Sequence, residues 1–333
     1  MIKETVELLP NFFKTKEVDL IVATSGYCQA LCESCVWPYM TPSRSVMNVE
    51  QFGRLLDTFA GFRFGEIAFN IINEPFTDRT VVEKLRLLAE RSVTAHVVFF
   101  SSNWLIPDRA KLESFAQAAR ECALVPTINY VTLNATLSGI DEESYDVLQA
   151  GANLTNTTNP YRKLDFAKAV GNVLEVLRLL QDRVPWEKTI FRIKAYGNLF
   201  SQDDLSQFWT EQFRKAHLSK GFIERCVKVL LNSGYTSFAR MERPLANRAP
   251  RWCSTGWVDN RVLVGPNGEV GLCCEDGLRS IVLGNIFETD LMTLCRSESY
   301  QDYMRIVRGL ERPSANSPCN SCQFFIPLEQ AAP

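Results

Sequence analysis

The chain has 333 residues, of which 46% are hydrophobic and 22% charged, and its formal net charge is -2 at pH 7. This length predicts one large domain or two smaller ones, and the lack of a basic excess argues against nucleic acid or an anionic membrane surface as a partner. No stretch approaches the roughly 18 apolar residues that span a bilayer, and the N-terminal MIKETVELLPNFF has no apolar signal core, so we expect a cytoplasmic protein.

Strand-like and helix-like segments alternate through the first 215 residues. Apolar runs of strand length cover residues 18–23, 66–72, 96–100, 130–137 and 189–196. Segments with helical periodicity or a helix-start signal follow them at residues 48–59, 80–91, 109–122, 141–149, 165–182 and 203–213. This rhythm predicts parallel βα units in an open sheet or a partial barrel, with ligands at the carboxyl ends of the strands.

Three cysteines lie in the loop after the first predicted strand, at C-x3-C-x2-C spacing: Cys28, Cys32 and Cys35. The whole chain has 11 cysteines. In a reducing compartment, cysteines hold metal or perform chemistry more often than they form disulfides. Three thiolates on a four-iron cluster would leave one iron open to a small molecule. Zinc and buried structural thiols are the competing interpretations of the same three residues.

The composition changes after about residue 240. There the helical periodicity ends and Arg, Pro, Trp, Gly and Cys become frequent, as in ERPLANRAPRWCSTGW. Residues 258–264 and 269–274 flank Gly265-Pro266-Asn267-Gly268, a hairpin turn signal, and a helix is expected over 291–308. Four cysteines frame this region: Cys253, Cys273, Cys319 and Cys322. So small a region with few apolar residues needs a bound metal or another crosslink to be stable. Four thiolates suit either zinc or an iron–sulfur cluster. Cys274 is an alternative to Cys273, because adjacent strand residues point to opposite faces.

On these motifs the sequence resembles the radical S-adenosylmethionine (SAM) enzymes of the SPASM/twitch group over nearly the whole chain. Besides the first three cysteines, the motifs on which the resemblance rests are Asn73-Glu74-Pro75, Ser102-Asn103, Thr136-Leu137-Ser138-Gly139, and the C-x14-G-x4-C spacing of Cys253, Gly268 and Cys273. They are similar to the family's Gly-Gly-Glu-Pro, Thr-Asn-Gly, Ser-x-Asp-Gly and cluster-binding motifs. Ser34 stands where the family usually has an aromatic residue, so Trp37 or Tyr39 is expected to take its place.

The resemblance implies an α/β fold with a partial (β/α)6 TIM-like barrel and a small C-terminal α+β twitch domain. The implied divisions are residues 1–16 (N-terminal extension), 17–215 (barrel), 216–245 (linker), 246–327 (twitch domain) and 328–333 (tail). It also implies two [4Fe-4S] clusters, one on Cys28, Cys32 and Cys35 and one on Cys253, Cys273, Cys319 and Cys322. The expected contacts of bound SAM are Glu74 to its ammonium group, Thr136 and Ser138 to its ribose, and further contacts from Trp37 and Asn103. Arg192 and Lys194 alternate along the predicted strand 189–196 and so share a face; one of them is expected to meet the SAM carboxylate, and Arg192 is preferred for its planar bidentate fork.

The activity implied is that of a radical SAM oxidoreductase in natural-product biosynthesis, with an electron donor of flavodoxin or ferredoxin type. Relatives with one auxiliary cluster include 2-deoxy-scyllo-inosamine dehydrogenase, and we therefore expect a small polar metabolite as substrate: a sugar, an aminocyclitol or a nucleoside. The first alternative is a maturase that crosslinks or epimerises a ribosomally made peptide. The second is a non-catalytic zinc-binding scaffold. The substrate, the carbon that loses hydrogen, the fate of SAM and any general base are not specified by these motifs.

Overall fold

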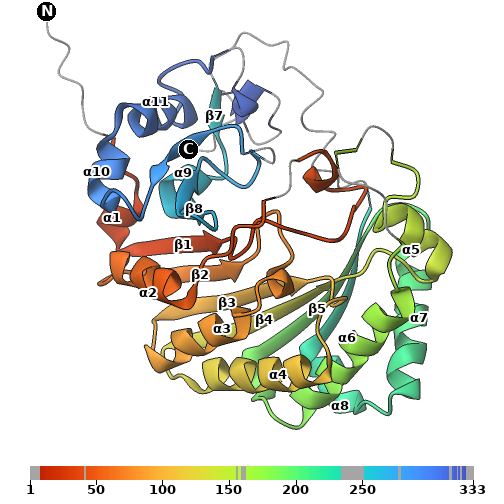
Figure 1. Ribbon diagram of the computed structural model, residues 1–333. Coiled ribbons are helices and arrows are strands. Elements are labelled where there is room, and N and C mark those ends of the chain that lie inside the picture. Colours follow the sequence, from red (N-terminus) through yellow and green to blue (C-terminus); the bar gives the residue numbers. More distant parts are fainter. Residues whose placement is uncertain are drawn as a thin grey trace, which may run out of the picture.

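The computed structural model describes residues 8–40, 43–154, 157–158, 163–233, 251–276, 279–314, 317–320, 322 and 325–327. In this part the chain forms an α/β fold around a nine-stranded sheet, with a layer of helices along one face of the sheet (Figure 1). The described residues include no helix that is long and apolar enough to cross a membrane.

Six parallel strands lie side by side in chain order and make up most of the sheet. They are β1 (Glu17–Val22), β2 (Arg63–Phe69), β3 (Ala95–Ser102), β4 (Ile128–Thr136), β5 (Thr189–Tyr196) and β6 (Val227–Asn232). The predicted α/β class and parallel sheet are thereby confirmed. The sheet is open, because β6 pairs only with β5 at one edge and β10 forms the other edge.

Helices connect successive parallel strands, as crossover connections between parallel strands require. The longer ones are α2 (Val49–Thr58), α3 (Val81–Glu90), α4 (Arg109–Leu124), α6 (Phe166–Gln181) and α7 (Gln202–Lys215); α1 (Phe12–Thr15), α5 (Glu142–Leu148) and α8 (Lys220–Cys226) are short, as are the 3-10 turns η1 (Trp37–Tyr39), η2 (Pro75–Thr77) and η3 (Trp186–Lys188). The predicted cap of α2 is confirmed, since the Asn48 side chain accepts a 2.7 Å hydrogen bond from the Gln51 N–H.

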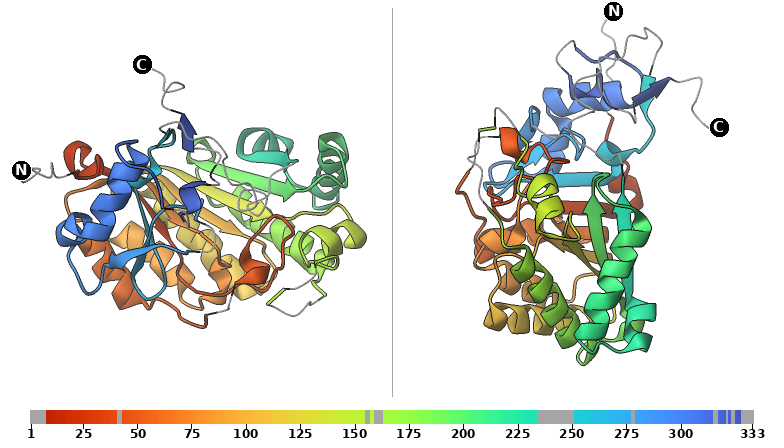
Figure 2. Two further views of the ribbon diagram at one scale, coloured as in Figure 1. Left: turned by 90° about the horizontal axis from the view of Figure 1, so that it is seen from above. Right: turned by 90° about the vertical axis from the view of Figure 1, so that its right-hand side faces the viewer.

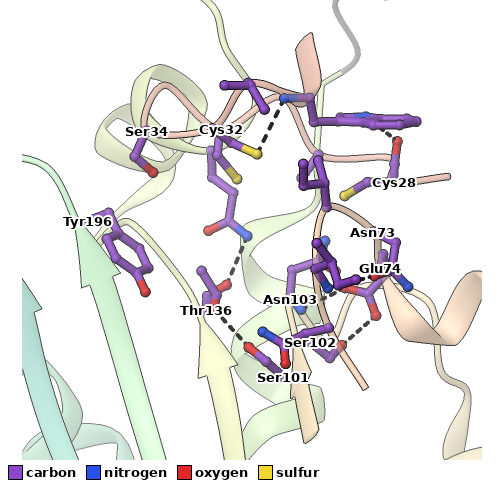
Figure 3. Close-up of a pocket in the computed structure, with 18 of the residues that line it drawn as sticks. Cys28, Cys32, Ser34, Asn73, Glu74, Ser101, Ser102, Asn103, Thr136 and Tyr196 are labelled. Atoms are coloured by element: carbon purple, nitrogen blue, oxygen red, sulfur yellow. Dashed lines mark hydrogen bonds between the residues drawn. The ribbon is translucent and has the colours of Figure 1, made fainter. Parts of the chain in front are cut away.

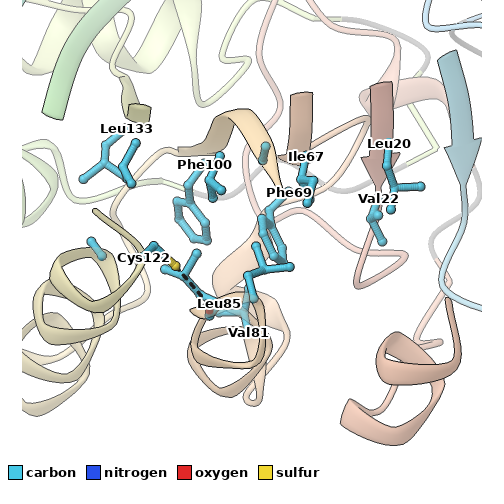
Figure 4. Close-up of a cluster of buried hydrophobic side chains, with 14 of the residues drawn as sticks. Leu20, Val22, Ile67, Phe69, Val81, Leu85, Phe100, Cys122 and Leu133 are labelled. Carbon is cyan, nitrogen blue, oxygen red and sulfur yellow. Dashed lines mark hydrogen bonds between the residues drawn. The ribbon is translucent and has the colours of Figure 1, made fainter. Parts of the chain in front are cut away.

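The main core lies between the sheet and this helix layer. Figure 4 shows Ile67, Phe69 and Phe100 from the strands packed against Val81 and Leu85 of α3. All five side chains are fully buried, and burial of each contributes about 1.5–3 kcal/mol. This core holds the strands in register and so fixes the positions of the loops at their carboxyl ends.

A buried ion pair lies at the start of α3. The Lys84 ammonium donates hydrogen bonds to Asp78 Oδ2 at 2.6 Å and to Thr80 Oγ1 at 2.7 Å, and both charged side chains are fully buried. We expect Lys84→Met to lower the free energy of unfolding by about 3–5 kcal/mol, because the Asp78 carboxylate would stay buried without a counter-charge. Urea unfolding followed by circular dichroism measures this loss.

Arg109→Met is the matched control for that experiment. Arg109 pairs with Glu113 on the surface of α4, where its side chain is 72% exposed. Exposed pairs contribute little, so the midpoint of urea unfolding should hardly change. An equally small change for Lys84→Met would show that the buried pair is dispensable for stability.

The C-terminal region extends the same sheet. Strand β8 (Arg261–Val264) pairs in parallel with β1, and β9 (Glu269–Gly271) and β10 (Val282–Asn285) follow in antiparallel order. A separate two-stranded sheet joins β7 (Arg251–Cys253) to β11 (Phe325–Pro327). Figure 2 shows these cyan to blue elements at the β1 side of the sheet, away from α7 and α8. The helices among them are α9 (Trp257–Asn260), α10 (Leu291–Arg296), α11 (Glu298–Val307) and the 3-10 turn η4 (Pro318–Asn320).

Three local structures differ from the expectations. Part of the expected linker, residues 220–232, forms α8 and the edge strand β6, whose short apolar run could not be told from a helix segment by periodicity. Residues 257–260 form α9 where strand was expected. The helix expected over 291–308 is broken at Ser297, whose extended backbone ends α10 and whose hydroxyl accepts a hydrogen bond from the Tyr300 N–H to start α11.

Candidate functional site

A cavity of about 270 Å³ opens at the carboxyl ends of the parallel strands. Its wall consists of the loops after β1 and β2, the ends of β3, β4 and β5, Gln149 after α5, and Cys274 from the C-terminal region. Figure 3 shows side chains from these segments pointing toward a shared space. Folds of this class place their ligands at this end of the sheet, so the cavity is the candidate site.

All three cysteines of the first motif line this cavity, and their thiols are free of disulfides. Burial raises the pKa of Cys28 well above its usual value, and the nearby Glu74 and the other two thiols raise it further. Burial also raises the pKa values of Cys32 and Cys35. Three thiolates beside a carboxylate are unfavourable there without a cation, and bound iron would supply the compensating charge.

Backbone hydrogen bonds hold the loop that carries these cysteines. The Leu31 N–H donates to the Gln149 carbonyl at 3.0 Å, and the Glu33 N–H donates to the Leu148 carbonyl at 2.9 Å. The Trp37 indole donates to the Cys28 carbonyl at 2.8 Å. The middle of the loop is therefore tied to the end of α5, and Trp37 is tied back to Cys28.

Glu74 is the buried carboxylate of the cavity, with 2% of the residue exposed. Its Oε1 accepts hydrogen bonds from the Ser102 hydroxyl at 2.7 Å and the Phe76 N–H at 3.1 Å, and its Oε2 accepts one from the Asn103 N–H at 2.8 Å. Burial raises the pKa of Glu74 to about 7, although these three donors act in the opposite direction. The carboxylate is thus rigidly aimed and close to half ionised at neutral pH.

The structure places three more of the predicted SAM contacts at the cavity, namely Trp37, Asn103 and Thr136. Asn103 Oδ1 already accepts hydrogen bonds from the Gln29 side chain at 2.9 Å and the Leu105 N–H at 3.2 Å. Trp37 is 3% exposed and is therefore packed into the cavity wall. Ser34, which replaces the family's aromatic residue, also lines the cavity (Figure 3).

Ser138 and Arg192 are not part of the cavity lining. The Ser138 hydroxyl is fully buried and accepts a 3.0 Å hydrogen bond from the Tyr196 N–H, so it joins two strand ends. Arg192 lies on the face of β5 that also carries Tyr196, but four residues earlier and so deeper along the strand. The expected ribose contact of Ser138 and SAM-carboxylate contact of Arg192 find no support in this geometry.

Several lining residues were not anticipated. Ser101 is two residues before Asn103, and Tyr196 is four residues after Arg192, so each shares a side with a predicted contact. Strand alternation could have revealed both. Gln149 connects the Ser138 N–H to the Thr136 carbonyl, with hydrogen bonds of 2.7 and 2.9 Å, a contact without a sequence signal. Cys274 reaches the cavity because the β8–β9 hairpin joins the sheet next to β1, which no local pattern indicates.

Two polar atoms in the cavity wall have no hydrogen-bond partner among the described residues. They are Asn70 Oδ1 and Asn73 Nδ2, both inaccessible to solvent. Buried polar groups without partners are rare in folded proteins, and a polar ligand often completes them. The cavity thus offers one donor, one acceptor and the Glu74 carboxylate next to three thiols. This set fits a ligand that has charged amino-acid groups and lies beside a metal.

The four cysteines of the C-terminal region line a second, smaller cavity. Cys253 comes from β7, Cys273 from the segment after β9, and Cys319 from η4, while Cys322 follows shortly after. Burial raises the pKa of Cys319 to about 12, with the nearby Cys322 and Cys253 adding to the effect. Cys274 faces the first cavity instead, so the two adjacent cysteines belong to different sites.

The thiols surround these cavities without converging on a point. In the described ranges, no group of three or more His, Cys, Asp and Glu side chains is placed to hold a single metal ion. The first cavity, at about 270 Å³, has room for a polynuclear iron–sulfur group, and its three cysteines would leave one iron of such a group open.

Comparison with protein families identifies the C-terminal region. Residues 253–323 match the family model of SPASM, an iron–sulfur cluster-binding domain. The SPASM match starts at the first cysteine of the second site and includes its other three cysteines. An iron–sulfur cluster is therefore the group indicated for this region. No curated protein matches the chain in sequence.

Solved structures show the same fold over most of the chain. SuiB of Streptococcus suis bound to precursor peptide SuiA has a TM-score of 0.56 at 13% identity, covering 93% of this chain and 71% of that one. The enzyme anSMEcpe with bound AdoMet (SAM) and the Cp18Cys peptide has a TM-score of 0.51 at 12% identity, covering 92% and 86%. BtrN in complex with AdoMet and 2-DOIA reaches 0.45 at 13% identity, covering 88% and 87%, too low a score to carry an argument. At these identities the first two establish the fold alone.

Proposed function

We propose that this chain is a radical SAM enzyme with one cluster on Cys28, Cys32 and Cys35 and a second on Cys253, Cys273, Cys319 and Cys322. The observation that carries the proposal is the meeting of three thiols and the buried Glu74 carboxylate in one cavity at the strand ends. The SPASM match supports the second cluster, and the fold shared with AdoMet-bound anSMEcpe supports the first.

The residues of the cavity suit the parts of SAM. Glu74 would hold the ammonium group, because a buried carboxylate fixed by three donors forms a strong charge-assisted hydrogen bond. Asn70 and Asn73 supply an acceptor and a donor for its other polar atoms. A reduced cluster on the three thiols would supply the electron that splits SAM into methionine and a 5′-deoxyadenosyl radical. The protein's own part is to orient SAM and to exclude water.

A small polar metabolite remains the proposed substrate, with hydrogen abstraction from one of its carbons and a flavodoxin or ferredoxin as electron donor. The likeness to 2-deoxy-scyllo-inosamine dehydrogenase stays a prediction. Peptide maturation is the second candidate function, because SuiB is bound to a precursor peptide and anSMEcpe to the Cp18Cys peptide in the structures that share this fold.

The metal content distinguishes this proposal from the zinc scaffold. Anaerobic reconstitution with iron and sulfide should give about eight irons per chain and the broad visible absorption of iron–sulfur clusters. Protein that has been stripped of metal with a chelator should take up this iron and sulfide. Uptake of one or two zinc ions by the stripped protein, with no uptake of iron and sulfide, would contradict the proposal.

The affinity for SAM should depend on pH through Glu74. Its pKa of about 7 lies above the usual 4.5, so the ionised fraction falls about tenfold for each pH unit below 7. Since only the carboxylate pairs with ammonium, SAM should bind more tightly as pH rises from about 5 to 7, with a plateau beyond. Equilibrium dialysis of the reconstituted protein measures this. Glu74→Gln should bind SAM weakly and lose the rise; an unchanged pH profile in that variant would remove Glu74 from the site.

A further inference from the structure

The face of the sheet opposite the helix layer carries a group of charged side chains. On β5 the buried positions alternate with Arg192, Lys194 and Tyr196, which therefore share this inner face. Tyr196 lines the SAM cavity, so the two cations lie deeper along the same strand. At about 3.3 Å per residue, their backbones are about 7 and 13 Å below Tyr196.

Glu66 of β2 belongs to the same group of charges. It lies three strands from β5, yet Arg261, Asp19, Arg192 and Lys194 all act on its carboxyl group electrostatically. The charges of β2 and β5 on this face are therefore within reach of one another.

The charges on this face do not balance. Arg261 forms an ion pair with Asp19 at 3.0 Å and also acts on Glu66 more strongly than Arg192 or Lys194 does, so three cations share two carboxyl groups. Among the described residues, Arg192, Lys194 and Glu66 form no ion pair within 4.0 Å. Both cations are only partly exposed, and burial and then the neighbouring Arg192 lower the pKa of Lys194. Two half-buried cations side by side are unfavourable unless an anion joins them.

A second observation points to a ligand at the same height. Asn134 is 2% exposed, and its Oδ1 has no hydrogen-bond partner among the described residues. In the register of the sheet it lies between Ser101, which lines the SAM cavity, and Arg192. An unsatisfied amide next to Arg192 thus links the cations to the polar wall of the cavity.

We propose that Arg192 and Lys194 bind an anionic group of the substrate, a carboxylate or a phosphate, while the reacting carbon lies in the cavity above. This inference rests on the proposed function and narrows its substrate class to small polar metabolites that carry an acidic group. The spacing of about 7–13 Å along the strand suits a molecule of sugar-phosphate or sugar-acid length. Arg192 can bind such a group through two parallel N–H donors, and Lys194 adds a point charge.

The test uses inorganic phosphate and malonate as separate probes for the two kinds of anion. Binding to the reconstituted protein is measured by isothermal titration calorimetry, with SAM present, for the wild type, Arg192→Gln, Lys194→Gln and the conservative Arg192→Lys. The matched control is Lys228→Gln, because Lys228 is the register partner of Arg192 on β6 but is exposed. Circular dichroism and the unfolding midpoint establish that each variant is folded.

At least one probe should bind to the wild type and to Lys228→Gln with similar affinity. Its affinity for Arg192→Gln and for Lys194→Gln should be lower by about tenfold or more, and its affinity for Arg192→Lys should be intermediate. The tighter probe then names the acidic group. Affinity for SAM, and its cleavage without substrate, should be unchanged in the Gln variants. Absence of binding by both anions, or loss of SAM affinity in Arg192→Gln, would overturn the proposal; the latter would assign Arg192 to SAM itself. Failure of the wild type to cleave SAM would contradict the proposed function but leave the anion measurement intact.

Discussion

Replacing Cys32 by alanine should abolish the formation of 5′-deoxyadenosine from SAM, with a loss of at least about a thousandfold. Cys32 lies between Cys28 and Cys35 in a loop whose backbone is held by Gln149 and Leu148, and its loss leaves two thiols on that loop. Two thiolates hold a four-iron cluster poorly, and the electron for SAM cleavage would be lost with it. Iron content should fall from about eight to about four per chain, because the second site is intact.

Cys122→Ala is the matched control for this variant. Cys122 is fully buried in α4, away from both cavities, and its thiol donates a hydrogen bond to the Leu85 carbonyl at 3.2 Å. Its loss should lower stability slightly and leave iron content and SAM cleavage unchanged. If Cys32→Ala kept its full iron content and cleaved SAM at the rate of Cys122→Ala, the assignment of the first cluster would be wrong.

Cys273→Ala and Cys274→Ala should behave in opposite ways, although the two residues are adjacent. Cys273 lines the second cavity with three other cysteines, and Cys274 lines the first. Cys273→Ala should therefore lose about four irons per chain and lower the thermal unfolding midpoint by several degrees, because the metal stabilises a small domain. Cys274→Ala should retain about eight irons. Iron and sulfide analysis with differential scanning calorimetry on reconstituted protein measures both effects.

The converse pattern, with iron lost from Cys274→Ala and retained by Cys273→Ala, would show that the ligands are assigned to the wrong residue. Loss in both variants would mean that each cysteine holds a cluster. Either result would overturn the division of the two thiols between the two cavities.

The sequence predicted the elements whose patterns are local. The first five strands, the helix cap at Asn48 and the grouping of the two sets of cysteines all follow from spacing and periodicity over a few residues. The sequence patterns did not predict the positions of residues that depend on contacts between distant segments. Cys274 reaches the first cavity only because β8 pairs with β1, and β6 is recognisable only from its pairing with β5.

The predicted SAM contacts show the same limit on a smaller scale. Arg192 was assigned to the correct face of its strand, because alternation defines a face, but alternation does not say how far along the strand the cavity lies. Ser138 lies two residues after the end of β4, and its hydroxyl accepts the Tyr196 N–H and is not part of the cavity lining. Glu74 lies in the cavity because the turn at Pro75 and three backbone and side-chain donors fix it at the strand end.

We propose that this chain cleaves SAM by one-electron reduction at a cluster held by Cys28, Cys32 and Cys35. The most direct measurement incubates the anaerobically reconstituted wild-type protein with SAM and dithionite and quantifies 5′-deoxyadenosine and methionine by mass spectrometry. We predict equal amounts of both products, formed slowly without substrate and absent when dithionite is omitted. A protein that holds its full complement of iron and sulfide, binds SAM and still forms no 5′-deoxyadenosine would contradict this account.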